Sequence, residues 1–325
     1  MKKLARHTGL LLILVLALAA PAAAQDNDSA AQLEFVVEAF ENFAALSSYT
    51  ISGEQVVDQE MTIPGQGTMQ TYIESTLFYQ IGQTDGQMTQ LKGEMSMATE
   101  YSGDAFDEPM ALTMRMQYRL VDEVYYIRYE MNYPGMENVF PDEWLSFSLS
   151  EFTDLMQDVP GMESLDLSAL MELTGNQNAQ MLMPITAENL ISLTELEGET
   201  LDGQPMRVFE IELDYADMLN MAGLEGITAL VPSEIDLTEL AETIPFIQTV
   251  WIGADDQLPY RVVMAADYDM SDFFTQMMGG DMQTEMVQTM NSDMVLGDFD
   301  APFEVEAPAS SISFTKYFGT LGLTG

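Results

Sequence analysis

The sequence predicts an α+β fold in which one antiparallel sheet contains most of the chain. Three observations predict it: a helical pattern near the N-terminus, several later segments in which apolar and polar residues alternate, and turn residues between those segments. Apolar residues three and four positions apart share one face of a helix, whereas alternation with period two marks a strand with one dry and one wet face. We therefore expect hairpins of neighbouring strands, with helical segments packed against them.

The first residues have the pattern of an export signal. A short cationic stretch, an apolar run, a proline and three alanines follow one another: Lys2, Lys3, Arg6, Gly9–Ala20, Pro21 and Ala22–Ala24. This order is typical of a cleaved secretory signal, and the apolar run is shorter than the roughly 20 residues that span a bilayer. We therefore expect residues 1–24 to be removed and residues 25–325 to form a single domain outside the cytoplasmic membrane. The chain has no cysteine, so we expect neither a lipid anchor nor disulfides.

The charge excludes several classes of partner and of chemistry. The chain has 53 Asp and Glu against 10 Lys and Arg, and removal of the three signal cations would take the formal charge from −43 to −46. Nucleic acids and anionic headgroups are bound through Lys and Arg, so neither is expected as a partner. Without His or Cys in the mature chain, catalytic triads and the usual zinc sites are excluded. We therefore expect a protein that is not an enzyme and needs no cofactor. We also expect that high salt or bound Ca²⁺ reduces the repulsion between its acidic residues.

A change in the spacing of apolar residues predicts where the N-terminal helix ends and the first strands begin. Leu33 to Leu46 has helical spacing, and from Tyr49 the period is two. The expected strands are Ile51–Gln59, Met69–Gln80, Met88–Met97, Thr113–Val121 and a strand that begins at Val124. The last two form the clearest hairpin, across the turn Asp122-Glu123. Its predicted apolar face consists of Met114, Met116, Tyr118, Leu120, Tyr125, Ile127, Tyr129 and Met131.

The second half is predicted to contain a helical insert and further strands. Leu145–Leu173, interrupted by Pro160-Gly161, is interpreted as two short helices. Two strand pairs are expected after it: Ser192–Leu201 with Met206–Leu213 across Asp202-Gly203-Gln204, and Phe246–Ile252 with Tyr260–Ala266 around Asp255-Asp256. Between the pairs, Ala216–Leu240 is expected to be loop and short helix.

Methionine is unusually frequent, with 27 residues in the chain. Between Gly279 and Asp300 it recurs every fourth position, a spacing that fits a helix or a strand, and the clean alternation of the intervening residues favours a strand. Thioethers are flexible and polarizable. The methionines are therefore either ordinary core in place of leucine or the lining of a cavity for an apolar ligand. Binding of Cu(I) by thioethers alone is a third possibility.

Three stretches carry a resemblance to a known family. They are Leu46-Ser47-Ser48-Tyr49-Thr50-Ile51-Ser52-Gly53 after the helix, Val250-Trp251-Ile252-Gly253-Ala254-Asp255-Asp256-Gln257-Leu258-Pro259-Tyr260-Arg261-Val262, and Gly297-Asp298-Phe299-Asp300-Ala301-Pro302-Phe303-Glu304-Val305-Glu306-Ala307-Pro308. They resemble the corresponding parts of LppX/LprG-type proteins, in the wider superfamily of LolA/LolB-like lipoprotein carriers. The resemblance implies a strongly curved antiparallel sheet, a half-barrel, with helices on its concave face and a lipid held between them. Many relatives are anchored through an N-terminal cysteine, which this chain lacks.

From these observations we expect an exported carrier of a lipid or other apolar small molecule that makes transient contact with a membrane or an export partner. The alternative is a secreted structural or interaction protein with a fully packed core, stabilised by Ca²⁺. The residues expected to line a cavity are Met116, Tyr118, Tyr129, Phe209, Met286, Met290 and Met294. Asp267, Asp269 and Asp272 are either a Ca²⁺ cluster or a solvated loop.

Overall fold

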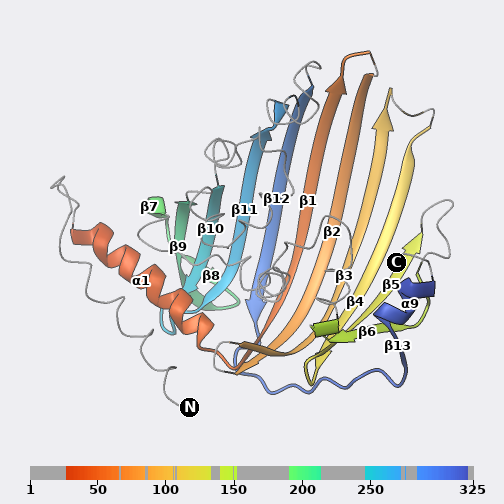
Figure 1. The fold of residues 1–325 in the computed structure, drawn as a ribbon. Helices are drawn as coiled ribbons and strands as arrows, with labels where there is room; N and C mark the ends of the chain where they lie inside the picture. Colours follow the sequence, from red (N-terminus) through yellow and green to blue (C-terminus); the bar gives the residue numbers. More distant parts are fainter. Residues whose placement is uncertain are drawn as a thin grey trace, which may run out of the picture.

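The computed structural model consists of a long N-terminal helix and one large sheet (Figure 1). It describes residues 27–65, 67–84, 87–104, 106, 108–132, 140–148, 150–151, 190–213, 246–271, 275 and 284–320. The elements are α1 (Asn27–Ala44), β1 (Ser48–Ile63), β2 (Gly67–Thr84), β3 (Gln87–Gly103), β4 (Met110–Val121), β5 (Val124–Asn132), β6 (Trp144–Ser148), β7 (Leu190–Glu195), β8 (Glu199–Leu201), β9 (Gln204–Leu213), β10 (Phe246–Gly253), β11 (Pro259–Asp269), β12 (Glu285–Gly297), β13 (Ser311–Ser313) and α9 (Phe314–Thr320).

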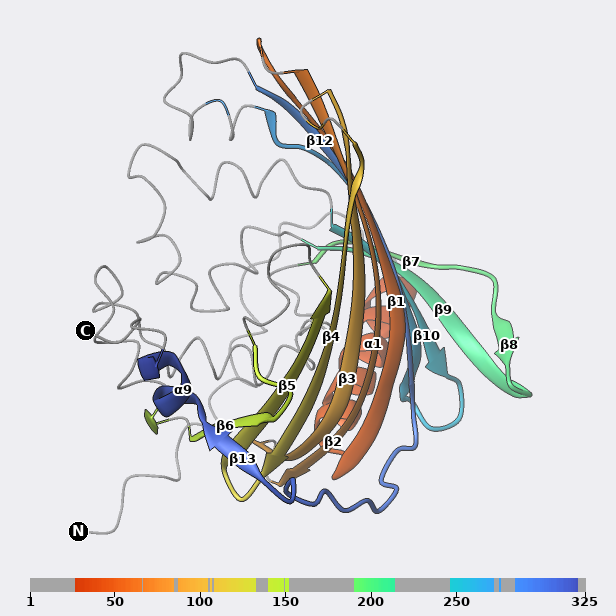
Figure 2. The ribbon, with the colours of Figure 1, turned by 90° about the vertical axis from the view of Figure 1, so that its right-hand side faces the viewer.

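The sheet has 13 strands in the order β13-β6-β5-β4-β3-β2-β1-β12-β11-β10-β9-β7, with β8 paired to β9. All pairings are antiparallel except that of β13 with β6. Seen from the side in Figure 2, the long strands bend along their length, so the sheet is open and strongly curved. The predicted fold class, a curved antiparallel sheet with an N-terminal helix, is confirmed.

Two hairpin turns explain why neighbouring strands pair in register. Asp122 and Glu123 have φ of 52° and 63°, and Asp202 and Gly203 have φ of 50° and 85°. Two consecutive residues with positive φ form the turn whose twist matches that of the strands it joins. The predicted hairpins β4–β5 and β8–β9 are therefore confirmed together with their turn residues.

Some boundaries differ from the prediction. The segment expected to begin a helix at Leu145 starts with β6, in which Leu145 and Phe147 are buried on one face. The strand expected at Ser192–Leu201 is divided into β7 and β8. The Met-rich segment forms β12, as the alternation predicted. The export signal, the rest of the helical insert and Ala216–Leu240 lie outside the described residues.

α1 packs on the concave side of the sheet, over the strands β7 and β9–β11 (Figures 1 and 2). Its apolar stripe, Val36, Ala39, Phe40 and Phe43, joins the main core cluster. The helix ends where Gln83 of β2 donates from its side-chain amide to the carbonyl oxygens of Ala44 and Leu46. Side-chain donors of this kind satisfy the last carbonyls of a helix and fix where it ends. Within the described residues, no helix has both the length and the apolarity needed to cross a membrane.

Candidate ligand-binding face

The strand register divides the sheet into two faces. We call the face on which α1 lies the inner face, and the opposite face the outer face. One row of paired residues crosses the inner face from β5 to β9: Tyr129, Met116, Met95, Leu77, Gly53, Met294, Val262, Val250 and Phe209. Successive residues of a strand point to opposite faces, so this row also assigns every second residue of each strand to the inner face.

No charged side chain lies on the inner face of β1–β6 or β10–β12 within these registers. The charged residues of the same strands, such as Glu54, Asp58, Glu94 and Arg115, alternate to the outer face. In a chain with 53 acidic residues, this separation leaves a wide surface made of thioether, aromatic, aliphatic and small polar groups. Such a surface offers apolar contact and neutral hydrogen bonds, and no charge–charge recognition.

Burial varies across the inner face. Near α1, Phe209, Met294 and Val262 are 0–1% exposed, because the helix covers them. Across β3–β5, Leu91, Thr99 and Leu120 are buried, but many other inner-face side chains are only half-buried. These half-buried residues are Met95, Met97, Met114, Met116, Tyr118, Tyr129 and Met131. The described residues therefore leave part of the apolar face incompletely covered.

The tyrosines of this face are held neutral. The ring of Tyr79 lies against Gly93, where a Cβ atom would come within 2.1 Å of it, and the ring centroid of Tyr118 is 6.0 Å away. Burial raises the pKa of Tyr79 to about 12 and also raises the pKa of Tyr118 and Tyr129. Burial disfavours the charged phenolate, so these hydroxyls remain uncharged hydrogen-bonding groups.

Several polar groups of the inner face bond to methionine sulfur. Gln55 donates its amide to Sδ of Met290 at 3.2 Å, and the Tyr118 hydroxyl donates to Sδ of Met116 at 3.0 Å. Thioether sulfur is a weak acceptor that a better partner can replace at low cost. These amide and hydroxyl groups can therefore turn to a ligand without leaving a strong bond.

Arg207 fastens α1 to the edge of the inner face. Its guanidinium lies 4.0 Å from the ring centroid of Phe35 in α1 and 5.0 Å from that of Phe209. It also donates to both carboxylate oxygens of Glu195, from Nε at 2.8 Å and from Nη2 at 2.9 Å, and Gln32 of α1 donates to the same carboxylate at 3.1 Å. These hydrogen bonds, first those from Arg207, lower the pKa of Glu195. A cation between two aromatic rings and a carboxylate thus joins the helix to β7 and β9.

All seven residues predicted from the sequence to line a cavity fall on the inner face. Tyr129, Met116, Met294 and Phe209 lie in the row described above, and Tyr118 lies in the next row. Met290 and Met286, paired with Val57 and Met61, lie further along β12. Whether they line a ligand cavity remains a prediction.

Arg207 was not among the residues predicted from the sequence. The signal was present, since Arg207 alternates with the dry positions Phe209, Ile211 and Leu213 of β9. A cation at the apolar face of a strand requires a partner, here Glu195.

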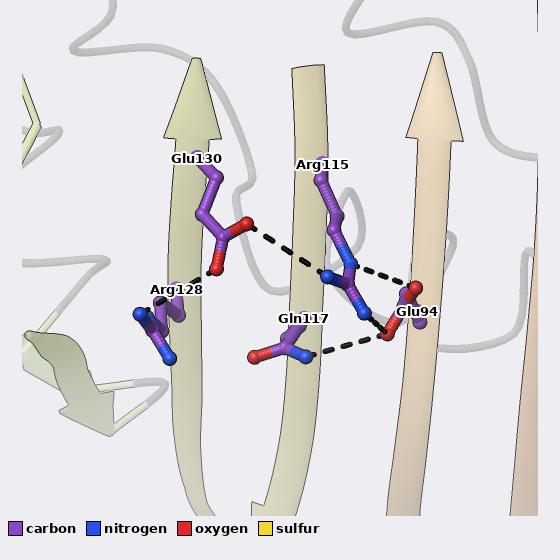
Figure 3. Close-up of polar contacts among 5 residues, drawn as sticks. All are labelled: Glu94, Arg115, Gln117, Arg128 and Glu130. Carbon is purple, nitrogen blue, oxygen red and sulfur yellow. Dashed lines mark hydrogen bonds and ion pairs between the residues drawn. The ribbon is translucent and has the colours of Figure 1, made fainter. Parts of the chain in front are cut away.

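The outer face carries the charged residues of β1–β6 and β10–β12 and a hollow beside some of them. Figure 3 shows a polar cluster on this face, in which Arg115 donates to both carboxylate oxygens of Glu94, at 2.8 and 2.7 Å. A carboxylate oxygen of Glu130 lies 3.8 Å from the Arg115 guanidinium, and the Gln117 amide donates to Glu94 at 3.3 Å. Arg128 lies 3.5 Å from Glu130. The hollow beside this cluster, about 590 Å³, is lined mainly by outer-face residues of β2–β5.

The predicted calcium site is not assembled from described residues. Asp267 and Asp269 both point outward from β11, Asp269 accepts a hydrogen bond from Ser271, and Asp272 lies outside the described part of the chain. Among the residues that the structure describes, no three acidic or histidine side chains gather closely enough to hold a metal ion. The Ca²⁺ cluster stays a prediction.

The fold and the inner face, which carries no charge on β1–β6 and β10–β12, define a half-barrel with a helix on its concave side. No family model matches the chain, and no curated protein matches it. Among solved structures, the chain is similar to LprF from Mycobacterium bovis, with 13% identity, a TM-score of 0.40, and 87% of this chain and 99% of that one covered. It is also similar to the lipoprotein LppX from Mycobacterium tuberculosis, with 11% identity, a TM-score of 0.33, and 85% of this chain and 99% of that one covered. A DUF1329 family protein from Desulfovibrio piger is similar with 9% identity, a TM-score of 0.24, and 85% of this chain and 95% of that one covered. These neighbours agree with the expected resemblance, but at such identities and TM-scores they carry no argument about activity.

Proposed function

We propose that this protein is an exported, non-enzymatic carrier that holds a lipid or another apolar molecule against the inner face of its sheet. The observation that carries the proposal is the absence of charge across the inner face of β1–β6 and β10–β12 in so acidic a chain. Apolar surface is driven out of water in proportion to its area. An apolar ligand is the partner that such a surface binds best.

The incomplete cover of the face supports a ligand over a packed core. Met95 and Met116 are half-buried, although their row ends in fully buried residues beneath α1. Flexible thioether side chains adapt to irregular apolar shapes at little cost in strain. The hydroxyl and amide groups bonded to sulfur offer neutral polar contacts to a ligand. Together these features suit a binding surface that accepts long, variable chains.

The remaining parts of the proposal concern location and organisation. A carrier of this kind would act after removal of residues 1–24, as one domain of residues 25–325, without a lipid anchor and without a cofactor. Its charge would keep it apart from anionic membrane surfaces, so contact with a membrane or an export partner would be brief.

The test is native mass spectrometry, with lipid extraction, on residues 25–325 purified in high salt without detergent. We expect a co-purifying apolar molecule in near-stoichiometric amount. The double variant Met286→Glu with Met290→Glu, on the inner face of β12, should lose it. The matched control Val287→Glu with Val295→Glu, on the outer face of the same strand, should retain it. The proposal would be refuted if the purified protein carried no ligand and bound none after incubation with a panel of lipids.

The second candidate is a secreted interaction protein, and the outer face favours it. Phe78 and Val295 are 43% and 46% exposed and flank Ser52 on neighbouring strands, while Tyr72 is 40% exposed. Exposed apolar groups that gather on one face often mark a contact with another protein. Analytical ultracentrifugation of the wild type and of Phe78→Gln separates the candidates. An association that Phe78→Gln abolishes, in a chain that takes up no apolar molecule, would favour the interaction protein.

A further inference from the structure

Gln248 has an unusual environment on the inner face. It lies in β10, is 0% exposed, and neither its Oε1 nor its Nε2 has a hydrogen-bond partner in the structure. Its neighbours across the sheet are Ile211 and Met264, and Phe246 and Val250 flank it along the strand. A buried amide without a partner loses its bonds to water and gains nothing in return. Such a group calls for a partner from outside the chain.

The row to which Gln248 belongs contains several neutral polar residues. Beyond Met264 it continues through Ser292 on β12, Gln55 on β1 and Ser75 on β2. The row of Met294 next to it, in contrast, is apolar from Met116 on β4 to Phe209 on β9, apart from Gly53. A molecule on the inner face would thus meet apolar groups over much of its length and a neutral polar track at one level of the sheet.

The chemistry of an amide restricts its partner. Gln248 offers a donor at Nε2 beside an acceptor at Oε1, so its complement must both accept and donate. A hydroxyl or a carboxamide does so, whereas a carboxylate only accepts and leaves Oε1 unpaired. The inner-face cation, Arg207, is paired with Glu195 and lies beside Ile252, two inner-face positions from Gln248 along β10. A ligand anion at Gln248 would therefore be desolvated without a counter-ion, in a chain of net charge −43.

We propose that Gln248 is the polar contact of the ligand site and that it selects a neutral lipid carrying a hydroxyl group, such as a long-chain alcohol or a mono- or diacylglycerol, over free fatty acids and hydrocarbons. The inference rests on the proposed carrier function and adds to it the class of ligand and a residue that determines specificity. The hydroxyl accepts from Nε2 and donates to Oε1, while the hydrocarbon chain lies along the methionine and aromatic rows.

The experiment compares three probes with the same 18-carbon chain: oleyl alcohol, oleate at pH 8 and 1-octadecene, each delivered from a cyclodextrin complex to residues 25–325. Affinity is measured for the wild type, for Gln248→Met, and for Gln117→Met, which makes the same change on the outer face. We expect the wild type to bind the alcohol at least about tenfold more tightly than the other probes, the effect of a hydrogen bond in an apolar site. Gln248→Met should lose this preference and still bind 1-octadecene, whereas Gln117→Met should keep it.

A second readout separates a ligand contact from a purely structural role. Gln248→Met removes a buried amide that has no partner, so the ligand-free variant should unfold at a higher temperature than the wild type. Retention of the alcohol preference by folded Gln248→Met would overturn the inference and indicate that water satisfies the amide. Equal binding of all three probes by the wild type would overturn the inference alone. Failure of the wild type to bind any probe would overturn the carrier function as well.

Discussion

Replacing Arg207 with methionine should loosen α1 from the inner face. Methionine keeps an unbranched apolar stem of similar length, so contact with Phe209 is largely preserved. The change removes the guanidinium that lies 4.0 Å from the Phe35 ring centroid and that pairs with Glu195. It also leaves Glu195, the acceptor for Gln32 of α1, without its cation. The helix then depends mainly on its apolar stripe.

The size of the effect follows from these contacts. A cation–π contact contributes about 0.5–1 kcal/mol when exposed and about 2 kcal/mol when desolvated. The side chains of Arg207 and Glu195 are 32% and 29% exposed, so their ion pair is discounted to about 0.2–1 kcal/mol. The variant should therefore lose about 1–2 kcal/mol of docking free energy, which corresponds to about a 5–30-fold increase in the population with α1 open. Val36, Phe40 and Phe43 remain buried, so the domain should stay folded.

Hydrogen exchange of the α1 amides measures this opening directly, since local opening limits their exchange. The control is Arg261→Met: Arg261 pairs with Asp293 at 2.8 and 2.6 Å and lies 4.8 Å from the Trp251 ring centroid, but on the outer face. We expect faster exchange in α1 for Arg207→Met only. Equal α1 exchange in the two variants would refute the role of Arg207 in fastening the helix.

Three further outcomes are expected. Phe209→Ala, at a side chain that is 0% exposed, should cost about 3–5 kcal/mol of unfolding free energy in urea titrations, and a loss below about 1 kcal/mol would contradict its central place in the core. Glu123→Gly, at φ of 63°, should raise the unfolding free energy by about 1 kcal/mol because glycine adopts this conformation without strain, and an unchanged urea midpoint would argue against that turn. Burial raises the pKa of Tyr49 and Tyr79 to about 12, so their contribution to stability is full below pH 10 and falls between pH 10 and 12, by about 1.4 kcal/mol per unit for each phenol. Urea midpoints at pH 9 and pH 11 check this direction, and equal midpoints would contradict it.

Local patterns in the sequence predicted much of this fold. Alternation predicted the strand β12 and the common face of Met116, Tyr118 and Tyr129, because period two is a property of the strand itself. The turns at Asp122-Glu123 and Asp202-Gly203 were also predictable, since residue type and turn type are linked locally. The same reasoning placed each candidate lining residue on the apolar face of its own strand.

Long-range pairing and single-residue environments were not predictable. Nothing local indicates that β1 pairs with β12, so the row joining Met116 to Met294 and Phe209 emerges only from the structure. β6 has only five residues, too few for a period to be recognised, and was mistaken for the start of a helix. The role of Gln248 was not predictable for a related reason, because one amide inside the apolar run Phe246–Ile252 does not change the pattern of apolar residues that predicts a strand.

The central pairing of β1 with β12 has a consequence for how the chain is made. Ser47, next to β1, bonds to Asp300, 253 positions away, so the middle of the sheet cannot close until almost the whole chain has left the ribosome. Until then one edge of β1 stays open, and open edges invite pairing with other chains. The acidic residues of β1, Glu54, Asp58 and Glu60, would discourage such aggregation.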